Sequence, residues 1–460
     1  MAKKLWGGRF TKKTDPAFEK FSSSFKWDIR LLPYDLAIDA AHVKALKKCG
    51  VLSAGESRKL LSVIDGLRKK MREGSLKLDS GAEDVHSAVQ AEIGRAAGPL
   101  ADKLHTARSR NDLVSQSSRL YCKEHAQTIY DLIVRLQKTI VQKAEEYQEV
   151  LLPGMTHLQN AQILSQGHIF LAYVEMLERS KARFSLTKDV SDVCVLGSGA
   201  LAGVTFALDQ KMIARDLGLS KITSNSYDVS GDRDYLLNFL SGCTVLGTHF
   251  SRIAEDLMVA QIKGFSLVEL DQAYCTGSSM MPQKKNADFV ELARSAVGIF
   301  GGNLTGFLLT LKGLPTSYNR DLQWDKSYIF QSVELCEELL GIFTGMFSSL
   351  KINRTRAKEL LADESLYATD LADFLVRKGV PFKTAHDQVG QMITFSESTG
   401  KPISKIGLDL LRGIAPKLDA RVYEIFSAEH SVGMKKTLGS THPARVKAQI
   451  SVWKKKLRNG

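Results

Sequence analysis

Long stretches with almost no glycine or proline constrain the fold of this chain more than any other feature. Residues 100–152 contain neither residue type. Within this stretch, apolar side chains recur at steps of three and four residues: Ala126, Ile129, Ile133, Leu136, Ile140, Ala144, Tyr147 and Leu151. Because charged residues fall between them, the spacing predicts a long amphipathic helix.

Four further stretches have the same character: residues 161–192, 234–263, 289–312 and 324–350. The second is apolar on nearly all sides, at Leu236, Phe239, Leu240, Val245, Leu246, Phe250, Ile253 and Leu257. We expect these residues to be buried, and period-two alternation is too rare to predict a sheet of any size. The pattern predicts an all-α bundle covered partly by other subunits, so we expect an obligate oligomer. A large monomeric helical protein is the alternative.

The length of 460 residues favours more than one domain. Shorter elements occupy residues 1–112, and the long helices occupy residues 113–360. Residues 361–460 form a third region, in which Gly379 and Pro381 should end a helix. We therefore predict three domains with these bounds.

Composition favours a soluble globular protein, with 44% hydrophobic and 25% charged residues. We expect no membrane association, because no apolar run approaches the length of a span. The first ten residues lack the apolar core of a secretion signal, so we expect a cytoplasmic protein. The six cysteines and ten histidines form no CxxC or HExxH pattern. We therefore expect neither disulfides nor a bound metal.

The net charge of +13 is spread along the chain. Basic runs are short, and no aromatic residues are interleaved with them. We therefore expect anionic small-molecule substrates and no nucleic-acid partner.

A short polar stretch at residues 275–286 carries the strongest signal for chemistry. Ser278 and Ser279 follow Gly277, and Lys284 comes six residues after Ser278. A serine hydroxyl is a weak base until a neighbouring cation or base activates it, and a loop that holds Ser278 near Lys284 would do so. A solvated turn would explain the same residues.

Two further polar segments lie next to the first long stretch. In residues 103–112, Asn111 or Asp112 is suited to cap the following helix, and the arginines are suited to bind a carboxylate. In residues 153–162, Pro-Gly should end one helix and Thr156 should cap the next. His157 follows this hydroxyl, although a histidine in such a turn is commonly structural.

Two more polar segments lie further along the chain. Residues 197–203 are glycine-rich, but their spacing does not fit a dinucleotide-binding loop, and we expect a turn between helices. In residues 311–326, Tyr318, Gln323 and Lys326 could project from one loop-to-helix junction, or the segment is an ordinary capped turn. Together the five segments supply a base, cations and an acid, which are the groups needed to remove a proton beside a carboxylate. No cofactor motif is visible.

The string GSSxMPxKxN at residues 277–286 resembles the signature of the fumarase/aspartase superfamily, and specifically its argininosuccinate lyase branch. All five segments resemble that branch in the same order, as do residues 5–10 and 368–382. The resemblance implies an all-α, three-part subunit. It also implies a homotetramer around a twenty-helix bundle, with each active site drawn from three subunits and no cofactor or metal.

The resemblance also implies a role for each matching residue. Ser278 matches the base, while Lys284 and Asn286 match residues that stabilise the carboxylate of the carbanion. His157 matches the acid or relay, and Glu291 the group that orients it. The remaining matches, beginning with Thr156, are contacts or members of the substrate pocket: Thr156, Ser24, Asp84, His86, Ser109, Arg110, Asn111, Arg233, Tyr318, Gln323 and Lys326.

The implied reaction is the reversible β-elimination of argininosuccinate to L-arginine and fumarate, a step of arginine biosynthesis. One alternative is a sister fumarate-releasing lyase, and another is a catalytically silent, crystallin-like homologue. The chain departs from the expected pattern at Ala107, Leu113, Met155, Asn160, Ile163, Asn238, Ala287 and Trp324. Of these, Ala287 replaces an expected proline, which would loosen the loop that follows Ser278.

Overall fold

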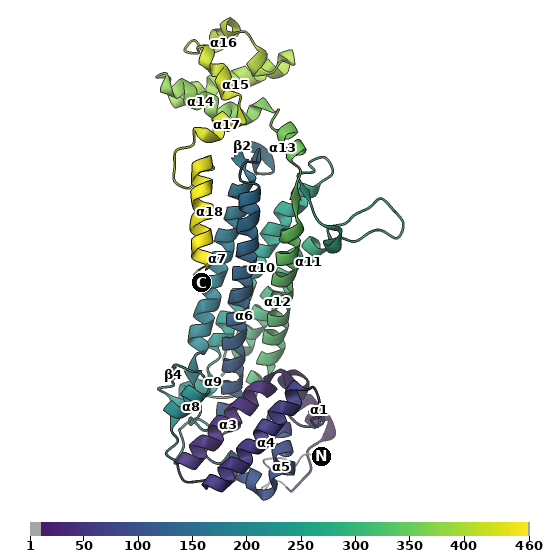
Figure 1. Ribbon diagram of the computed structural model, residues 1–460, viewed down its shortest axis with the longest axis vertical. Helices are drawn as coiled ribbons and strands as arrows, with labels where there is room; N and C mark the ends of the chain where they lie inside the picture. The colour runs from purple at the N-terminus through teal and green to yellow at the C-terminus, as the bar shows by residue number, and fades with distance from the viewer. Residues whose placement is uncertain (1–10, 459–460) are drawn as a thin grey trace. The chain divides into compact units, whose positions relative to one another are not determined.

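The computed structural model describes residues 11–458, so the resemblance at residues 5–10 lies outside the described part. Five long helices dominate it: α6 (Arg110–Glu146), α7 (Gln166–Ser191), α10 (Asp234–Gln261), α11 (Asp288–Leu311) and α12 (Asp325–Ser349). Each covers most of a stretch that the sequence predicts to be helical (Figure 1). The prediction of an all-α fold is confirmed.

The other elements are shorter than these five helices. The remaining α-helices are α1 (Pro16–Ser22), α2 (Phe25–Asp28), α3 (Leu32–Lys48), α4 (Ala54–Arg72), α5 (Val85–Ala97), α8 (Gln210–Asp216), α9 (Ser226–Gly231), α13 (Arg354–Leu360), α14 (Ala368–Arg377), α15 (Phe382–Thr399), α16 (Leu408–Ile414), α17 (Ala428–Gly433) and α18 (Pro443–Arg458). The 3₁₀ helices are η1 (Ile29–Leu31), η2 (Gly98–His105), η3 (Gln272–Tyr274), η4 (Arg320–Trp324), η5 (Glu364–Tyr367), η6 (Ile403–Lys405) and η7 (Ala420–Ile425).

The strands form two-stranded ladders. Their bounds are β1 (Leu151–Thr156), β2 (Gln159–Ser165), β3 (Val193–Cys194), β4 (Lys221–Ile222), β5 (Val268–Glu269) and β6 (Lys351–Ile352). The first and third ladders are antiparallel and the second is parallel.

The β1–β2 hairpin corrects the expectation that Thr156 caps a helix. Thr156 pairs with Gln159 across a two-residue turn, and α7 begins only at Gln166. Both turn residues, His157 and Leu158, have positive φ, at 56° and 57°. Such a turn matches the twist of paired strands. Gly154 allows the strands to approach, because a Cβ there would lie 2.6 Å from the Leu164 side chain.

The chain divides into two compact units. Within the described residues, unit 1 comprises residues 11–131, 180–247 and 296–338, and unit 2 comprises residues 132–179, 248–295 and 339–458. All five long helices contribute residues to both units. This division does not test the predicted three-domain division, which stays a prediction.

In unit 1, the helices α3, α4 and α5 contact one another. A capping box at Ser53 and Glu56 fixes the start of α4. One apolar cluster of unit 1 joins α3 and α8 to the first turns of α6, through residues that include Ile38, Ile213 and Leu113.

In unit 2, segments of the long helices pack together. The Phe250 and Phe343 rings stack with centroids 4.4 Å apart, and the Tyr173 hydroxyl donates to Asp256 at 3.0 Å. A second core joins α14, α15 and η7 to Ile163 of the hairpin. Ile163, which stands where a proline is expected, is therefore buried in an apolar cluster. As predicted, α14 ends at Arg377, just before Gly379 with a φ of +86°.

The predicted burial of α10 is confirmed at seven of its eight apolar positions, and Val245 is half-buried. Helix α11 is different. It is long and apolar enough to cross a membrane by length and composition, although only 22% of its apolar window is buried. The expectation that no run of the chain approaches a span is therefore wrong for α11. One such helix is weak evidence for a span, because helices of soluble proteins pass the same test.

Candidate active site

The Ser278 loop joins η3 to α11, and its two ends are tied together. Thr276 and Asn286 exchange backbone hydrogen bonds of 3.0 and 2.8 Å. The Asn286 side chain also donates to the Gly277 carbonyl oxygen at 3.3 Å, and the Thr276 hydroxyl donates to Asp288. These contacts hold the base of the loop closed in a chain that has Ala287 instead of proline.

The Ser278 hydroxyl oxygen lies at the start of a tight turn within this loop. It accepts the backbone N–H groups of Met281 at 3.1 Å and Met280 at 3.3 Å. Hydrogen bonds of this kind favour the ionised form of an oxygen acid, and therefore support a serine that acts as a base. Ser278 is half-buried and Lys284 is exposed. Among residues 11–458, no hydrogen bond joins the Lys284 ammonium to Ser278.

The tip of the hairpin presents Thr156 and His157 to solvent. Glu291, in the first turn of α11, is also exposed. Within the described residues of unit 2, no hydrogen bond or ion pair connects His157 with Glu291 or with the Ser278 loop. The isolated chain therefore displays these groups on separate exposed segments.

A buried charge cluster in unit 1 contains Lys326 and Arg233. The Lys326 ammonium lies 2.9 Å from Asp325 Oδ1 and 4.0 Å from Asp28 Oδ1, and the Arg233 Nε donates to Asp325 Oδ2 at 2.9 Å. Burial lowers the pKa of Lys326, but the Asp325 and Asp28 carboxylates outweigh it and raise the pKa above the usual value. Ser24 donates its hydroxyl to Asp28. Three predicted residues therefore share two carboxylates.

A second group surrounds Arg110. Its guanidinium donates to Glu83 at 3.0 Å, to the Ser87 hydroxyl at 2.7 Å and to Asp84. Burial would raise the pKa of Asp84, but His86 and Arg110 outweigh it and lower the pKa to about 2. Within the described residues, Arg110 thus binds carboxylates and a hydroxyl of the same chain.

His86 is also buried in this region. Its Nδ1 contacts Asp35, and its Nε2 has no hydrogen-bond partner among the described residues. Burial lowers the pKa of His86, but the Asp35 carboxylate outweighs this and raises it. His86 is therefore held next to carboxylates through Nδ1, and its buried Nε2 makes no hydrogen bond to the described residues.

The junction between η4 and α12 holds the segment before Ser24. Gln323 donates to the Ser22 carbonyl oxygen at 2.8 Å, and Arg320 donates to the same oxygen at 3.1 Å. Trp324, which replaces an expected acidic residue, lies edge-on to Phe21 with ring centroids 6.0 Å apart. Tyr318 is half-buried in the loop that precedes this junction.

The cap of α6 differs from the expectation. Ser109, rather than Asn111 or Asp112, occupies the capping position: its hydroxyl accepts the Asn111 N–H at 3.2 Å, and Asp112 Oδ1 accepts the Ser109 N–H at 3.0 Å. This is a variant of the capping box. Nearby, Ala107 has a φ of 57°, which explains why glycine is expected there.

Several carboxylates of these clusters were not among the predicted site residues: Asp28, Asp35, Glu83 and Asp325. Sequence reasoning missed them because an aspartate or glutamate without a motif is ordinarily exposed. The adjacency of Asp325 to Lys326 was the one available signal.

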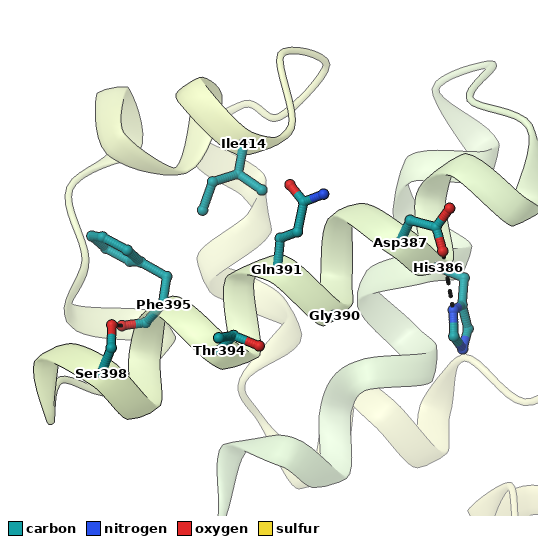
Figure 2. Close-up of a pocket in the computed structure, with 8 residues that line it drawn as sticks. All are labelled: His386, Asp387, Gly390, Gln391, Thr394, Phe395, Ser398 and Ile414. Carbon is teal, nitrogen blue, oxygen red and sulfur yellow. Dashed lines mark hydrogen bonds and ion pairs between the residues drawn. The ribbon is translucent and has the colours of Figure 1, made fainter.

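Two cavities lie away from all the predicted residues. One, of about 710 Å³, is an open hollow along α15, bordered by Gln391, Phe395 and Ile414 of α16 (Figure 2). The other, of about 470 Å³, lies between Tyr34, Lys123 and Leu217 in unit 1. The candidate site therefore rests on the loops and clusters described above, and not on either cavity.

Comparisons with known proteins place these segments in a family. A lyase family model matches residues 8–301, and an argininosuccinate lyase C-terminal model matches residues 365–433. The argininosuccinate lyase of Caldicellulosiruptor saccharolyticus is 39% identical over 99% of this chain and 98% of its own length. That of Bacillus velezensis is 40% identical over 95% of this chain and 96% of its own length.

Solved structures agree on the fold. An EDDS lyase in complex with formate has a TM-score of 0.85 and 25% identity, covering 98% of this chain and 91% of that one. A class II fumarase from Schistosoma mansoni has a TM-score of 0.74 and 17% identity, covering 86% of this chain and 90% of that one. From the matches to family models and full-length relatives, the chain belongs to the argininosuccinate lyase family.

Proposed function

We propose that this protein is an argininosuccinate lyase that cleaves argininosuccinate reversibly to L-arginine and fumarate. The observation that carries the proposal is its likeness to known argininosuccinate lyases along nearly its full length. The match to the C-terminal model of that family separates this function from those of sister lyases. The reaction belongs to arginine biosynthesis and the enzyme to the cytoplasm.

In this proposal Ser278 removes a proton from the succinyl carbon. The two backbone N–H groups on its hydroxyl oxygen support the ionised serine. Lys284 and Asn286 stabilise the negative charge that develops on the neighbouring carboxylate, because a cation and an amide donor act most strongly where charge appears in the transition state. The bond between that carbon skeleton and the leaving nitrogen then breaks. His157, oriented by Glu291, donates or relays a proton to the leaving nitrogen, and Thr156 contacts the substrate beside it.

The residues of unit 1 form the second part of the proposed pocket. They supply hydroxyl, amide and cationic groups suited to a substrate that carries several carboxylates. The proposed contacts are Ser24, Asp84, His86, Ser109, Arg110, Asn111, Arg233, Tyr318, Gln323 and Lys326. Neither a metal nor an organic cofactor takes part in the proposed step.

We further propose a homotetramer around a twenty-helix bundle, with three-part subunits divided at residues 112 and 360 and active sites shared between subunits. The exposed hairpin tip and the exposed Ser278 loop support a shared site, because neighbouring chains can bring them together. The exposed apolar side chains of α11, which include Leu292, Ile299 and Leu309, support its role as a subunit interface rather than a membrane span.

Mixing two inactive variants tests the shared site. Ser278→Ala and His157→Ala should each abolish fumarate release, but hybrids formed by unfolding and refolding the two together should regain activity, because some sites then receive both intact residues. Light scattering should report four chains per particle. Hybrids as inactive as the separate variants, or a fully helical monomer, would contradict shared sites.

Fumarate release tests the activity itself. The purified protein should release fumarate, measured by its ultraviolet absorbance, from argininosuccinate and much more slowly from adenylosuccinate, aspartate, malate or EDDS. Preference for one of these other substrates would show a sister lyase. Release from none of them would show a silent, crystallin-like homologue.

A further inference from the structure

Asp112 is a buried carboxylate that joins two segments of unit 1. It is 1% exposed and lies in the first turn of α6. One oxygen accepts the backbone N–H of Ser109 at 3.0 Å, which completes the helix cap. The other oxygen accepts the backbone N–H of Gly199 at 3.0 Å, from the glycine-rich segment at residues 197–203. Asp112 therefore ties the α6 cap to that segment.

The glycine-rich segment, residues 197–203, is shaped for this contact. Gly199 has a φ of +59°, and a Cβ there would lie 2.9 Å from the Gly203 carbonyl oxygen. The Gly203 N–H closes the segment by donating to the Ser198 carbonyl oxygen at 2.8 Å. A second bridge to α6 runs alongside, because the Asn111 side chain donates to the Ala200 carbonyl oxygen at 3.3 Å. Two hydrogen bonds therefore join residues 197–203 to the start of α6.

A helix cap alone does not require a buried carboxylate. Asp209 caps α8 by accepting the Met212 N–H at 2.9 Å, with the cation of Lys48 beside it, and its pKa is lowered. At Asp112 burial outweighs Arg108 and the backbone donors, and it raises the pKa to about 7. Burying a charge that an exposed residue could carry is costly, so the position of Asp112 needs a reason besides capping.

We propose that Asp112 is a positioning residue that fixes the Ser109–Asn111 segment against residues 197–203, so that Asn111 meets the substrate in a set orientation. This inference rests on the proposed function, in which Ser109 and Asn111 contact argininosuccinate. Asp112 itself does not touch the substrate. Its loss acts through the orientation of its neighbours and weakens binding of ground state and transition state alike, so KM rises and kcat changes little.

The test compares Asp112→Asn with the full wild-type chain. The asparagine has the same shape, but its amide N–H₂ replaces one acceptor oxygen and faces a backbone donor. Loss of one strong hydrogen bond predicts a KM for argininosuccinate about tenfold higher, with kcat within about twofold. The matched control is Asp209→Asn, which removes a carboxylate cap in the same unit and should leave KM unchanged. Circular dichroism and light scattering check that each variant is folded and assembled.

A second variant approaches the contact from the other side. Gly199→Ala leaves Asp112 intact but distorts residues 197–203, because the added Cβ lies 2.9 Å from the Gly203 carbonyl oxygen at a residue with a φ of +59°. The distortion displaces the Gly199 N–H from Asp112, and it should raise KM in the same way. A KM equal to that of wild type in either folded variant would overturn the proposal, even if thermal stability falls. It would show that Asp112 caps α6 and does not position Asn111 for the substrate.

Calorimetric binding of argininosuccinate to Ser278→Ala, with and without Asp112→Asn, separates this proposal from the function. The Kd should also rise about tenfold. A wild-type chain that binds argininosuccinate without releasing fumarate would refute the proposed function. The ratio of the two Kd values would then still test the role of Asp112. A chain that does neither would overturn both.

Discussion

Replacing Asp325 by asparagine should destabilise the protein strongly, because this carboxylate neutralises two buried cations. Asp325 is 1% exposed, and it contacts Arg233 Nε and Lys326 Nζ, both at 2.9 Å. The asparagine keeps the shape of the side chain but removes the charge. The two cations are then left in the interior, with Asp28 as the remaining nearby carboxylate at 4.0 Å from Lys326.

The magnitude follows from this geometry. Removing one partner of a buried ion pair typically costs about 3–5 kcal/mol, because the remaining charge stays buried. Asp28 still offsets part of the Lys326 charge, so we expect a value near the lower end, about 3 kcal/mol. With a urea dependence of about 3 kcal/mol per molar for a large domain, the unfolding midpoint should fall by roughly 1 M.

Urea unfolding followed by circular dichroism measures this change, with the protein concentration held fixed because the proposed subunit association would add to the stability. The matched control is Asp321→Asn, which lies on the same segment but is exposed. Its midpoint should change by an amount equivalent to less than about 0.5 kcal/mol. Equal midpoints for the two variants would refute the description of Asp325 as the counter-charge of a buried cluster.

Two further predictions concern unit 1. Burial lowers the pKa of His42 to about 3, below the value of about 6.5 in an unfolded chain, so its contribution to stability is complete above pH ~6.5 and is lost as the pH falls toward 3. At pH 5 the loss is about 2 kcal/mol. The variant His42→Gln should therefore reduce the difference in unfolding free energy between pH 8 and pH 5 by about 2 kcal/mol. If His42→Gln leaves this difference unchanged, His42 is protonated in the folded state at pH 5. At Gly231 a Cβ would lie 2.0 Å from the Thr316 carbonyl oxygen, so Gly231→Ala should cost about 1–3 kcal/mol in urea unfolding, whereas Gly66→Ala, in open space within α4, should stabilise by up to about 1 kcal/mol. The same sign for both glycine variants would contradict the close approach at Gly231.

The long helices were predictable because their signal is local. The apolar steps in residues 126–151 and the scarcity of glycine and proline describe α6 without reference to the rest of the chain. The hairpin was missed because its turn consists of His157 and Leu158. These residue types do not predict a positive φ, whereas an Asn-Gly pair does. Its register depends on packing against Gly154 and on the core around Ile163, which no local pattern reveals.

The candidate site was predictable to the extent that its residues lie in motifs. The Ser278 string and the Thr156–His157 pair stand out from the sequence, and the structure adds their exposure and the N–H groups on Ser278. Which carboxylate partners Lys326 depends on contacts between distant segments, such as Asp28 with the start of α12. These pairings follow from the tertiary fold and are invisible in one-dimensional spacing.

The central claim is that Ser278 takes the proton in an argininosuccinate lyase, and fumarate release by Ser278→Ala tests it most directly. Ser279→Ala is the matched control, since it removes the neighbouring exposed hydroxyl of the same loop. We predict that Ser278→Ala lowers kcat by at least about 10²- to 10⁴-fold, the usual contribution of a general base, while Ser279→Ala stays near wild type. Fumarate release by Ser278→Ala at the wild-type rate would contradict the claim.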